Sequence, residues 1–487
     1  MLISTYPEYI QSSFPYDPTQ FVEREHELRM IADRVRPVQL GEISVEVMVH
    51  FWGVWGIGKT WLIQHVQHLY AYSPAQQLPS LGLRATFTML CSFSQSVPLE
   101  TYIRDLAEQV LAQLGQVVPA EVHAALLHVR DSGEASRLLD ALLAISSQFV
   151  PVILLDQVEQ AEHNVWRRLE QDLIEPLIRR EAAVVVSASR YAAPRWRSFE
   201  LRRRTMATPI SRLQPFSRDV VLQQFEQRGY RTVFDVLYPY CAGNPQLIDA
   251  LVRHVCAWQH DQAALDQDLG NYQAAMLQIL RLAETELLEH VSPQLRPIVY
   301  AIAPLRFYRI EALRFMLTEQ QMVAEEQPDG FYLSMMRDLS EMTDLIWWDR
   351  RSRAYMISEV ARQVINRRQL LEDQHAFAAS HRQASQMYWG WMRQFVRTGE
   401  EYALEILFHL ACLYQVDRDE QYLYAEIKKV LDFVRQHFSI QHVLLFQNLV
   451  NVDTELADLF PKDVLADLFR QIEQMLEQKM TGAVSSN

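Results

Sequence analysis

The sequence predicts an α/β domain with a three-layer parallel sheet and a phosphate-binding loop (P-loop), then a helical lid, a winged helix and an all-α C-terminal region. A GxxxxGKT loop at 53–60 lies between a β-rich run at 45–52 and a helical pattern at 59–70. Further apolar runs alternate with helical stretches, as in a parallel sheet covered on both faces. These runs lie at 83–93, 150–155 and 182–189.

Length and composition limit the classes of protein to consider. A chain of 487 residues is long enough for about three or four domains. Its net charge of -14 argues against wholesale nucleic-acid wrapping and against an acidic membrane surface as the main partner. We expect no membrane partner, because no stretch approaches the roughly 18 apolar residues of a spanning helix. Four scattered cysteines without metal-ligand spacing favour a reducing, cytoplasmic setting.

Changes in pattern along the chain predict five segments. The first, 1–20, is an extended lead-in rich in Tyr, Pro, Ser and Gln, and 21–212 forms the P-loop core. Strand signals fade after residue 217, so 213–283 is expected to be the helical lid. Helices and two short β runs joined by a charged turn predict a winged helix at 284–368. The remaining segment, 369–487, is expected to be helical throughout.

The lysine distribution singles out the P-loop. The chain has only five lysines, and Lys59 is the sole one before Lys428. A compact ammonium fits between phosphate oxygens where a planar guanidinium does not, which explains why lysine is present here. Around it, the loop glycines turn backbone amides toward phosphate, and the Thr60 hydroxyl is a candidate Mg²⁺ ligand. These glycines are Gly53, Gly56 and Gly58.

A second carboxylate motif lies further along the chain. The apolar run 152–155 ends at Asp156, the arrangement in which a strand-end aspartate holds Mg²⁺. Gln157 follows, where many hydrolysing P-loop proteins carry a second acid. Glutamine can position a water molecule but cannot accept its proton, so we expect slow hydrolysis, with Glu159 as a candidate to assist it.

Four further segments resemble STAND-class P-loop NTPases, the class of NB-ARC and NACHT-like ATPases and AAA+ relatives. Residues 21–28 resemble the family's FVGREREL segment, which implies adenine contacts for Val22 and Arg24, with Glu23 replacing the usual glycine. Residues 184–190 are similar to the sensor-1 strand, which gives Arg190 a γ-phosphate role. Segments 213–217 and 241–247 resemble the start of the lid and the GxP motif. The latter implies that Pro245 packs on the base.

The resemblance extends over about 21–410 and implies a molecular switch that binds ATP or ADP with Mg²⁺. In this class the ATP form oligomerises and activates an effector, so we expect a homo-oligomer and a separate effector or regulator protein. One departure concerns the winged helix, where the family's nucleotide-sensing histidine is replaced in the run 355–359.

Two alternatives stay open. The first is an AAA+ DNA-handling ATPase of the origin-recognition or transposition-regulator type, which would use the wing arginines Arg350, Arg351 and Arg353. The second is a scaffold in which bound nucleotide only stabilises the fold. A basic cluster at 195–204 is interpreted as a solvated or subunit edge, with a phosphate contact or an arginine supplied to a neighbouring subunit as the other readings.

Overall fold

The computed structural model describes residues 16–44, 46–73, 83–192, 195–207, 211–231, 234–258, 269–323, 327–343, 345–349 and 352–484. The chain divides into two compact units, residues 1–261 and 262–487. Each unit is described by itself below.

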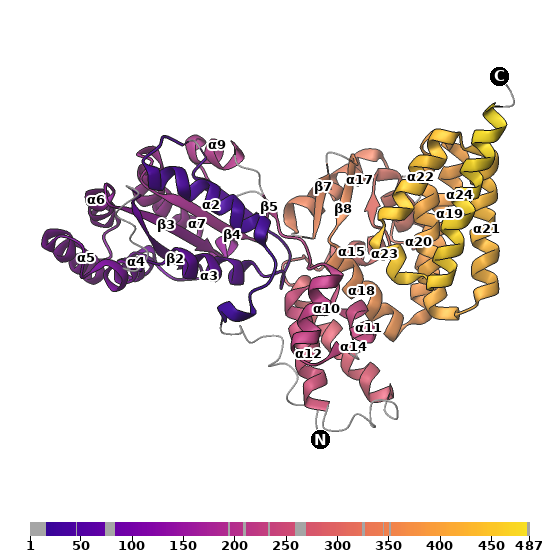
Figure 1. Ribbon diagram of the computed structural model, residues 1–487, viewed down its shortest axis with the longest axis horizontal. Helices are drawn as coiled ribbons and strands as arrows, with labels where there is room; N and C mark the ends of the chain where they lie inside the picture. The colour runs from indigo at the N-terminus through magenta and orange to yellow at the C-terminus, as the bar shows by residue number, and fades with distance from the viewer. Residues whose placement is uncertain are drawn as a thin grey trace. The chain divides into compact units, whose positions relative to one another are not determined.

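A five-stranded parallel sheet forms the centre of the first unit, in the order β2-β3-β4-β1-β5 (Figure 1). The strands β3 and β4 are buried along their whole length, as expected for central strands covered on both faces. The bounds are β1 Met48–Trp52, β2 Ala85–Ser92, β3 Phe149–Asp156, β4 Val184–Ser189 and β5 Ser211–Arg212. The predicted strands are therefore present, and β5 is an addition that pairs with β1.

Helices cover the sheet, with α2 packed on β1, β3 and β4, and α3 packed on β2, β3 and β4 (Figure 1). Two helices that the sequence analysis did not single out, α5 and α6, pack beside α4. The helices of this unit are η1 Pro18–Gln20, α2 Glu25–Leu40, α3 Lys59–Tyr70, α4 Leu99–Leu114, α5 Ala120–Ser132, α6 Ala135–Ile145, η4 Val158–Gln160, α7 His163–Leu169, the π-helical turn η5 Glu170–Ile174, α8 Glu175–Arg179, α9 Phe199–Ala207, α10 Arg218–Gln227, α11 Phe234–Cys241 and α12 Pro245–Trp258.

The second unit contains the winged helix. A three-stranded sheet in the order β6-β8-β7 pairs Ile346 with Ile357 and Asp349 with Ala354 across the wing. The two short β runs of the sequence analysis are thus β7 and β8. The elements are α15 Arg296–Ile302, β6 Phe307–Tyr308, α16 Ile310–Glu319, α17 Asp329–Met342, β7 Ile346–Asp349, β8 Ala354–Ile357 and α18 Glu359–Glu372.

The rest of the second unit is helical, as predicted. The long helix α20 is its centre, because α19, α21, α22 and α23 all pack on it. The bounds are α14 Leu269–Leu287, α19 Gln374–Gln394, η7 Val396–Thr398, α20 Gly399–Asp417, α21 Glu420–His437, α22 Ile440–Val452, α23 Thr454–Leu459 and α24 Lys462–Val484.

The predicted fold class, an α/β P-loop domain followed by helical lid, winged helix and helical C-terminal region, is confirmed. The five segment boundaries stay predictions. The proposed one at 283/284 lies inside α14, which packs on α18 of the winged helix. Among the described residues, no helix combines the length and the apolar character needed to cross a membrane.

Candidate nucleotide site

The predicted site residues of the sheet collect at one edge. Trp52 of β1 lies beside Ser189 of β4, so the loop that begins at Gly53 and the residue Arg190 leave neighbouring strands together. Asp156 ends β3, on the other side of β4. Parallel strands end at the same edge, which explains how segments more than 130 residues apart reach one place.

The P-loop wraps around its own lysine. The Lys59 ammonium donates hydrogen bonds to the carbonyls of Gly53 at 2.7 Å and Val54 at 2.9 Å. Gly56 and Gly58 have φ values of 73° and 93°, in the left-handed region that favours glycine. Gly58 caps α3 without a side-chain hydrogen bond, so the first-turn amides of α3 point toward the loop with the positive end of the helix dipole.

The two predicted Mg²⁺ ligands lie together. Asp156 is buried, with 1% of its surface exposed, and its carboxylate accepts hydrogen bonds from the Thr60 hydroxyl and from the Gln157 amide at 3.0 Å. Burial raises the pKa of Asp156, although the Thr60 hydrogen bond and the Lys59 charge act in the opposite direction. A buried carboxylate beside a hydroxyl is an oxygen donor pair that suits Mg²⁺, whose charge would offset the desolvation.

Glu159, three residues after Asp156, contacts Arg190, the arginine predicted to reach the γ-phosphate. Glu159 accepts a hydrogen bond from the Arg190 amide at 3.2 Å, and its carboxylate is 3.8 Å from the Arg190 guanidinium. Both side chains are largely buried, with 7% and 11% of their surfaces exposed. The carboxylate expected to assist hydrolysis is therefore engaged by an arginine, and Gln157 is the residue next to the predicted Mg²⁺ ligand Asp156.

The N-terminal segment reaches the loop through Arg24. Its guanidinium donates to the Ile57 carbonyl at 3.0 Å and lies 5.0 Å from the centre of the Phe216 ring. Glu23 and Arg24 both have positive φ values, 60° and 74°. The glycine expected at position 23 would adopt this backbone at lower cost than glutamate. Val22, predicted to contact the base, is half-buried beside this turn.

Asn244, which lies in the Gly-Asn-Pro sequence typical of a helix start, joins the lid to the loop. Asn244 is fully buried, and its amide nitrogen donates to the Trp55 carbonyl at 2.9 Å. Its amide oxygen accepts from the backbone amides of Gln246 and Leu247, both at 3.1 Å, and so caps α12. Gln246 also donates its amide to the Gly56 carbonyl at 3.3 Å. The Gly-Asn-Pro sequence was a signal for this cap.

Close packing makes glycine necessary on both sides of this contact. A Cβ added to Gly56 would lie 2.7 Å from the Asn244 amide oxygen, and one added to Gly243 would lie 2.3 Å from the Phe216 carbonyl oxygen. Pro245, predicted to pack on the base, lies next to Gly58, where an added Cβ would be 3.8 Å from its ring. The structure thus brings the P-loop, Arg24 and Pro245 together.

His50 of β1 is a residue that the sequence analysis did not identify. It is buried, and its ring nitrogens contact the Ser187 hydroxyl at 2.9 Å and the Tyr191 carbonyl at 3.0 Å. Burial lowers the pKa of His50 to about 4. The neutral imidazole therefore joins β1 to the end of β4 near Arg190.

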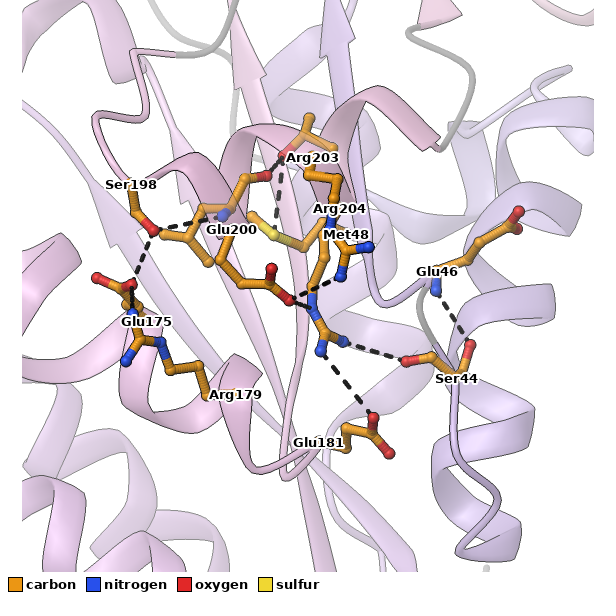
Figure 2. Close-up of polar contacts among 12 residues, drawn as sticks. Ser44, Glu46, Met48, Glu175, Arg179, Glu181, Ser198, Glu200, Arg203 and Arg204 are labelled. Carbon is orange, nitrogen blue, oxygen red and sulfur yellow. Dashed lines mark hydrogen bonds and ion pairs between the residues drawn. The ribbon is translucent and has the colours of Figure 1, made fainter.

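Two arginines of the basic cluster at 195–204, Arg203 and Arg204, pair with carboxylates of the same unit. Figure 2 shows Arg204, which is buried, bonded to Glu200 at 2.7 Å, to the Ser44 carbonyl at 3.2 Å and within 4.0 Å of Glu181. Arg203 shares Glu200 at 3.3 Å. These contacts assign Arg204 to internal packing. Arg202 remains exposed.

The parallel sheet and the loop around Lys59 together define a P-loop α/β protein. Solved structures with similar folds include the Aeropyrum pernix Orc1 protein in complex with DNA, with 14% identity over 77% of this chain and 98% of that chain and a TM-score of 0.36. Cdc6p from Pyrobaculum aerophilum has 13% identity over 75% and 98% of the two chains, with a TM-score of 0.33. AMPPCP-bound DnaA from Aquifex aeolicus has 10% identity over 67% and 91%, with a TM-score of 0.34.

No family model and no curated protein matches the sequence. The three solved structures are Orc1, Cdc6 and DnaA proteins, so the resemblance to the STAND class is not confirmed by them. At TM-scores below 0.5 these likenesses carry no functional argument, and the function is argued below from the site's own contacts.

Proposed function

We propose that this chain is an ATP-dependent conformational switch that binds ATP or ADP with Mg²⁺ at the P-loop and hydrolyses ATP slowly. The contact between Asn244 and the Trp55 carbonyl carries the proposal. Through it, and through the bonds from Gln246 to Gly56 and from Arg24 to Ile57, the loop is held by the lid and by the N-terminal segment. A loop that changes shape when it binds phosphate must therefore move or release these partners.

The same geometry assigns roles to the site residues. Lys59 would exchange its bonds to the loop carbonyls for phosphate oxygens, and the α3 amides would stabilise the same charge. Thr60 and Asp156 would hold Mg²⁺, which supplies charge neutralisation when bound. Gln157 could orient a water molecule but not deprotonate it, and Glu159 is engaged with Arg190. Slow turnover follows from this arrangement.

Isothermal titration calorimetry tests the nucleotide site. We expect MgATP and MgADP to bind the wild-type protein. Both should bind Lys59→Met at least about 100-fold more weakly, because the loop 53–60 loses the ammonium group that would contact the phosphates. Lys428→Met is the matched control, because Lys428 is exposed on α21 in the other unit. Equal affinities for wild type and Lys59→Met, or no heat from either nucleotide, would overturn the proposal.

The switch is further proposed to assemble in its ATP form and to act through a separate effector or regulator protein. The STAND resemblance of the sequence is the support for this step. Light scattering on the full chain with MgADP and with a non-hydrolysable ATP analogue is the test. We expect a larger mass with the ATP analogue, and an unchanged mass would contradict the assembly step.

A second candidate function is DNA handling through the winged helix, and the wing is the observation that favours it. Trp348 on β7 has 48% of its surface exposed, and Arg353 is exposed at the turn into β8. Arg337 on α17 of the same winged helix lies 3.6 Å from Asp338, and this carboxylate partly offsets the positive charge of Arg337. The other wing arginines, Arg350 and Arg351, lie outside the described residues.

Fluorescence anisotropy with a labelled DNA duplex tests this candidate at several salt concentrations. If the wing contacts phosphates, affinity falls steeply with salt, and Arg353→Glu reduces the slope of log affinity against log salt by about one contact. Arg382→Glu, an exposed arginine on α19, is the control. A salt slope that is unchanged in Arg353→Glu would exclude Arg353 as a phosphate contact.

A further inference from the structure

A cleft of about 640 Å³ lies between α19 and α21 in the helical region of the second unit. Its lining on α19 follows one helical face, at intervals of three and four residues, and α21 faces it in the same manner. The lining residues are Gln386, Trp389, Gly390, Arg393, Glu426, Lys429, Asp432, Phe433 and Gln436. This volume lies within the range of binding pockets, about 300 to 1,000 Å³.

Two aromatic rings and a glycine form the apolar part of the cleft. Trp389 and Phe433 lie edge to face with centroids 6.1 Å apart, so the rings bridge the two helices. Gly390 lies inside a 21-residue helix, and a Cβ built on it would have no neighbour within 4 Å. Glycine in a helix interior costs about 1 kcal/mol relative to alanine. Neither close packing nor a positive φ requires glycine at position 390. A ligand that approaches the helix backbone closely would require it.

In the part of the chain that the structure describes, most charged side chains that line the cleft pair with an opposite charge, but Arg393 does not. Glu426 pairs with Lys429 at 2.5 Å, and Asp432 pairs with Arg435 at 3.2 Å. Arg393 has its guanidinium 5.3 Å from the centre of the Trp389 ring, and no carboxylate within ion-pair distance among the described residues. The cleft thus presents one uncompensated cation over an aromatic surface, which attracts a carboxylate attached to an apolar group.

We propose that this cleft binds a short extended peptide of a partner protein, in which a carboxylate side chain lies next to an aromatic or bulky apolar side chain. The lining covers seven residues of rise on α19 and ten on α21, about 10 to 15 Å. That length accommodates about three to five extended residues. The exposed side chains of Gln386 and Gln436 lie at the cleft, where they can bond a peptide backbone. The inference does not depend on the nucleotide site.

A phage-displayed library of random 12-residue peptides, selected on the full chain, tests the proposal. We expect the recovered sequences to share an acidic residue within three positions of an aromatic or bulky apolar one. Binding of a fluorescent peptide of that sequence should weaken at least about tenfold in Gly390→Met and in Arg393→Glu. Methionine is a better helix former than glycine, so Gly390→Met fills the cleft without destabilising α19.

Two control variants match these changes. Gly330→Met places the same side chain on α17, where an added Cβ also meets nothing within 4 Å, and Arg382→Glu reverses an exposed arginine of α19 outside the cleft. Both should bind the peptide as the wild type does. Recovery of no shared sequence, of a basic one, or of peptides that Gly390→Met binds equally well would overturn the proposal. Equally tight binding of free phenylacetate would overturn the peptide as occupant.

Discussion

Two substitutions of Asn244 distinguish its cap of α12 from its hydrogen bond to the P-loop. Asn244→Ala removes the α12 cap, formed by two bonds of 3.1 Å, together with the 2.9 Å bond to the Trp55 carbonyl. Loss of an Asn cap costs about 1 kcal/mol. A buried carbonyl that loses its partner costs about 1–3 kcal/mol more. We therefore expect the free energy of unfolding of the first unit to fall by about 2–4 kcal/mol, the sum of these two effects.

Asn244→Asp isolates the loop contact, because aspartate is an equally good cap but cannot donate to the Trp55 carbonyl. Hydrogen–deuterium exchange distinguishes the variants. We expect Asn244→Ala to exchange faster both in α12 and in the loop at 53–58, and Asn244→Asp to exchange faster in the loop alone. Calorimetry should show altered MgATP affinity in both variants, since each changes the loop that is proposed to hold the phosphates.

A matched control exists in the second unit. Asn366 is buried and donates to the Ala303 carbonyl at 2.9 Å, so Asn366→Asp makes the same chemical change away from the nucleotide site. It should destabilise its own unit and leave MgATP affinity unchanged. If Asn244→Asp retained wild-type exchange in the loop and wild-type affinity, the coupling between lid and loop would be refuted.

Three further predictions concern catalysis, packing and acid stability. Gln157→Glu supplies a proton acceptor and should raise steady-state ATP turnover at least about tenfold, and an unchanged rate would show that water activation is not limiting. Gly56→Ala combines a φ of 73° with a contact of 2.7 Å to Asn244, so urea unfolding should show a loss of about 1–3 kcal/mol, and wild-type stability would contradict the packing. His381 and His409 are buried with their Nδ1 atoms 2.9 Å apart, and burial lowers the pKa of His381 to about 3. The unfolded chain, with a histidine pKa near 6.5, binds the proton first, so protonation of His381 should lower stability between about pH 6.5 and pH 3 by up to about 1.4 kcal/mol per pH unit. Urea unfolding of wild type and of His381→Phe across this range is the measurement, and equal slopes would contradict the assignment.

The elements and the position of the P-loop were predictable from local sequence. The alternation of apolar runs with helical patterns depends on residues a few positions apart. The GxxxxGKT loop is likewise a local motif, because its glycines permit the turn and Lys59 bonds the carbonyls of the same loop. The helix at 59–70 and the strand ending at Asp156 agree with the structure for this reason. The wing strands were likewise visible as two β runs joined by a charged turn.

Contacts between distant segments were decided only by tertiary structure. Sheet order places β4 between the strand of the P-loop and the strand of Asp156, and no local pattern specifies that order. The hydrogen bond from Asn244 to Trp55 joins residues 189 positions apart. The sequence left Glu159 as a candidate to assist hydrolysis, whereas in the structure its carboxylate pairs with Arg190. Such pairings depend on which groups burial leaves without water, because a buried polar group must then find a partner elsewhere in the fold.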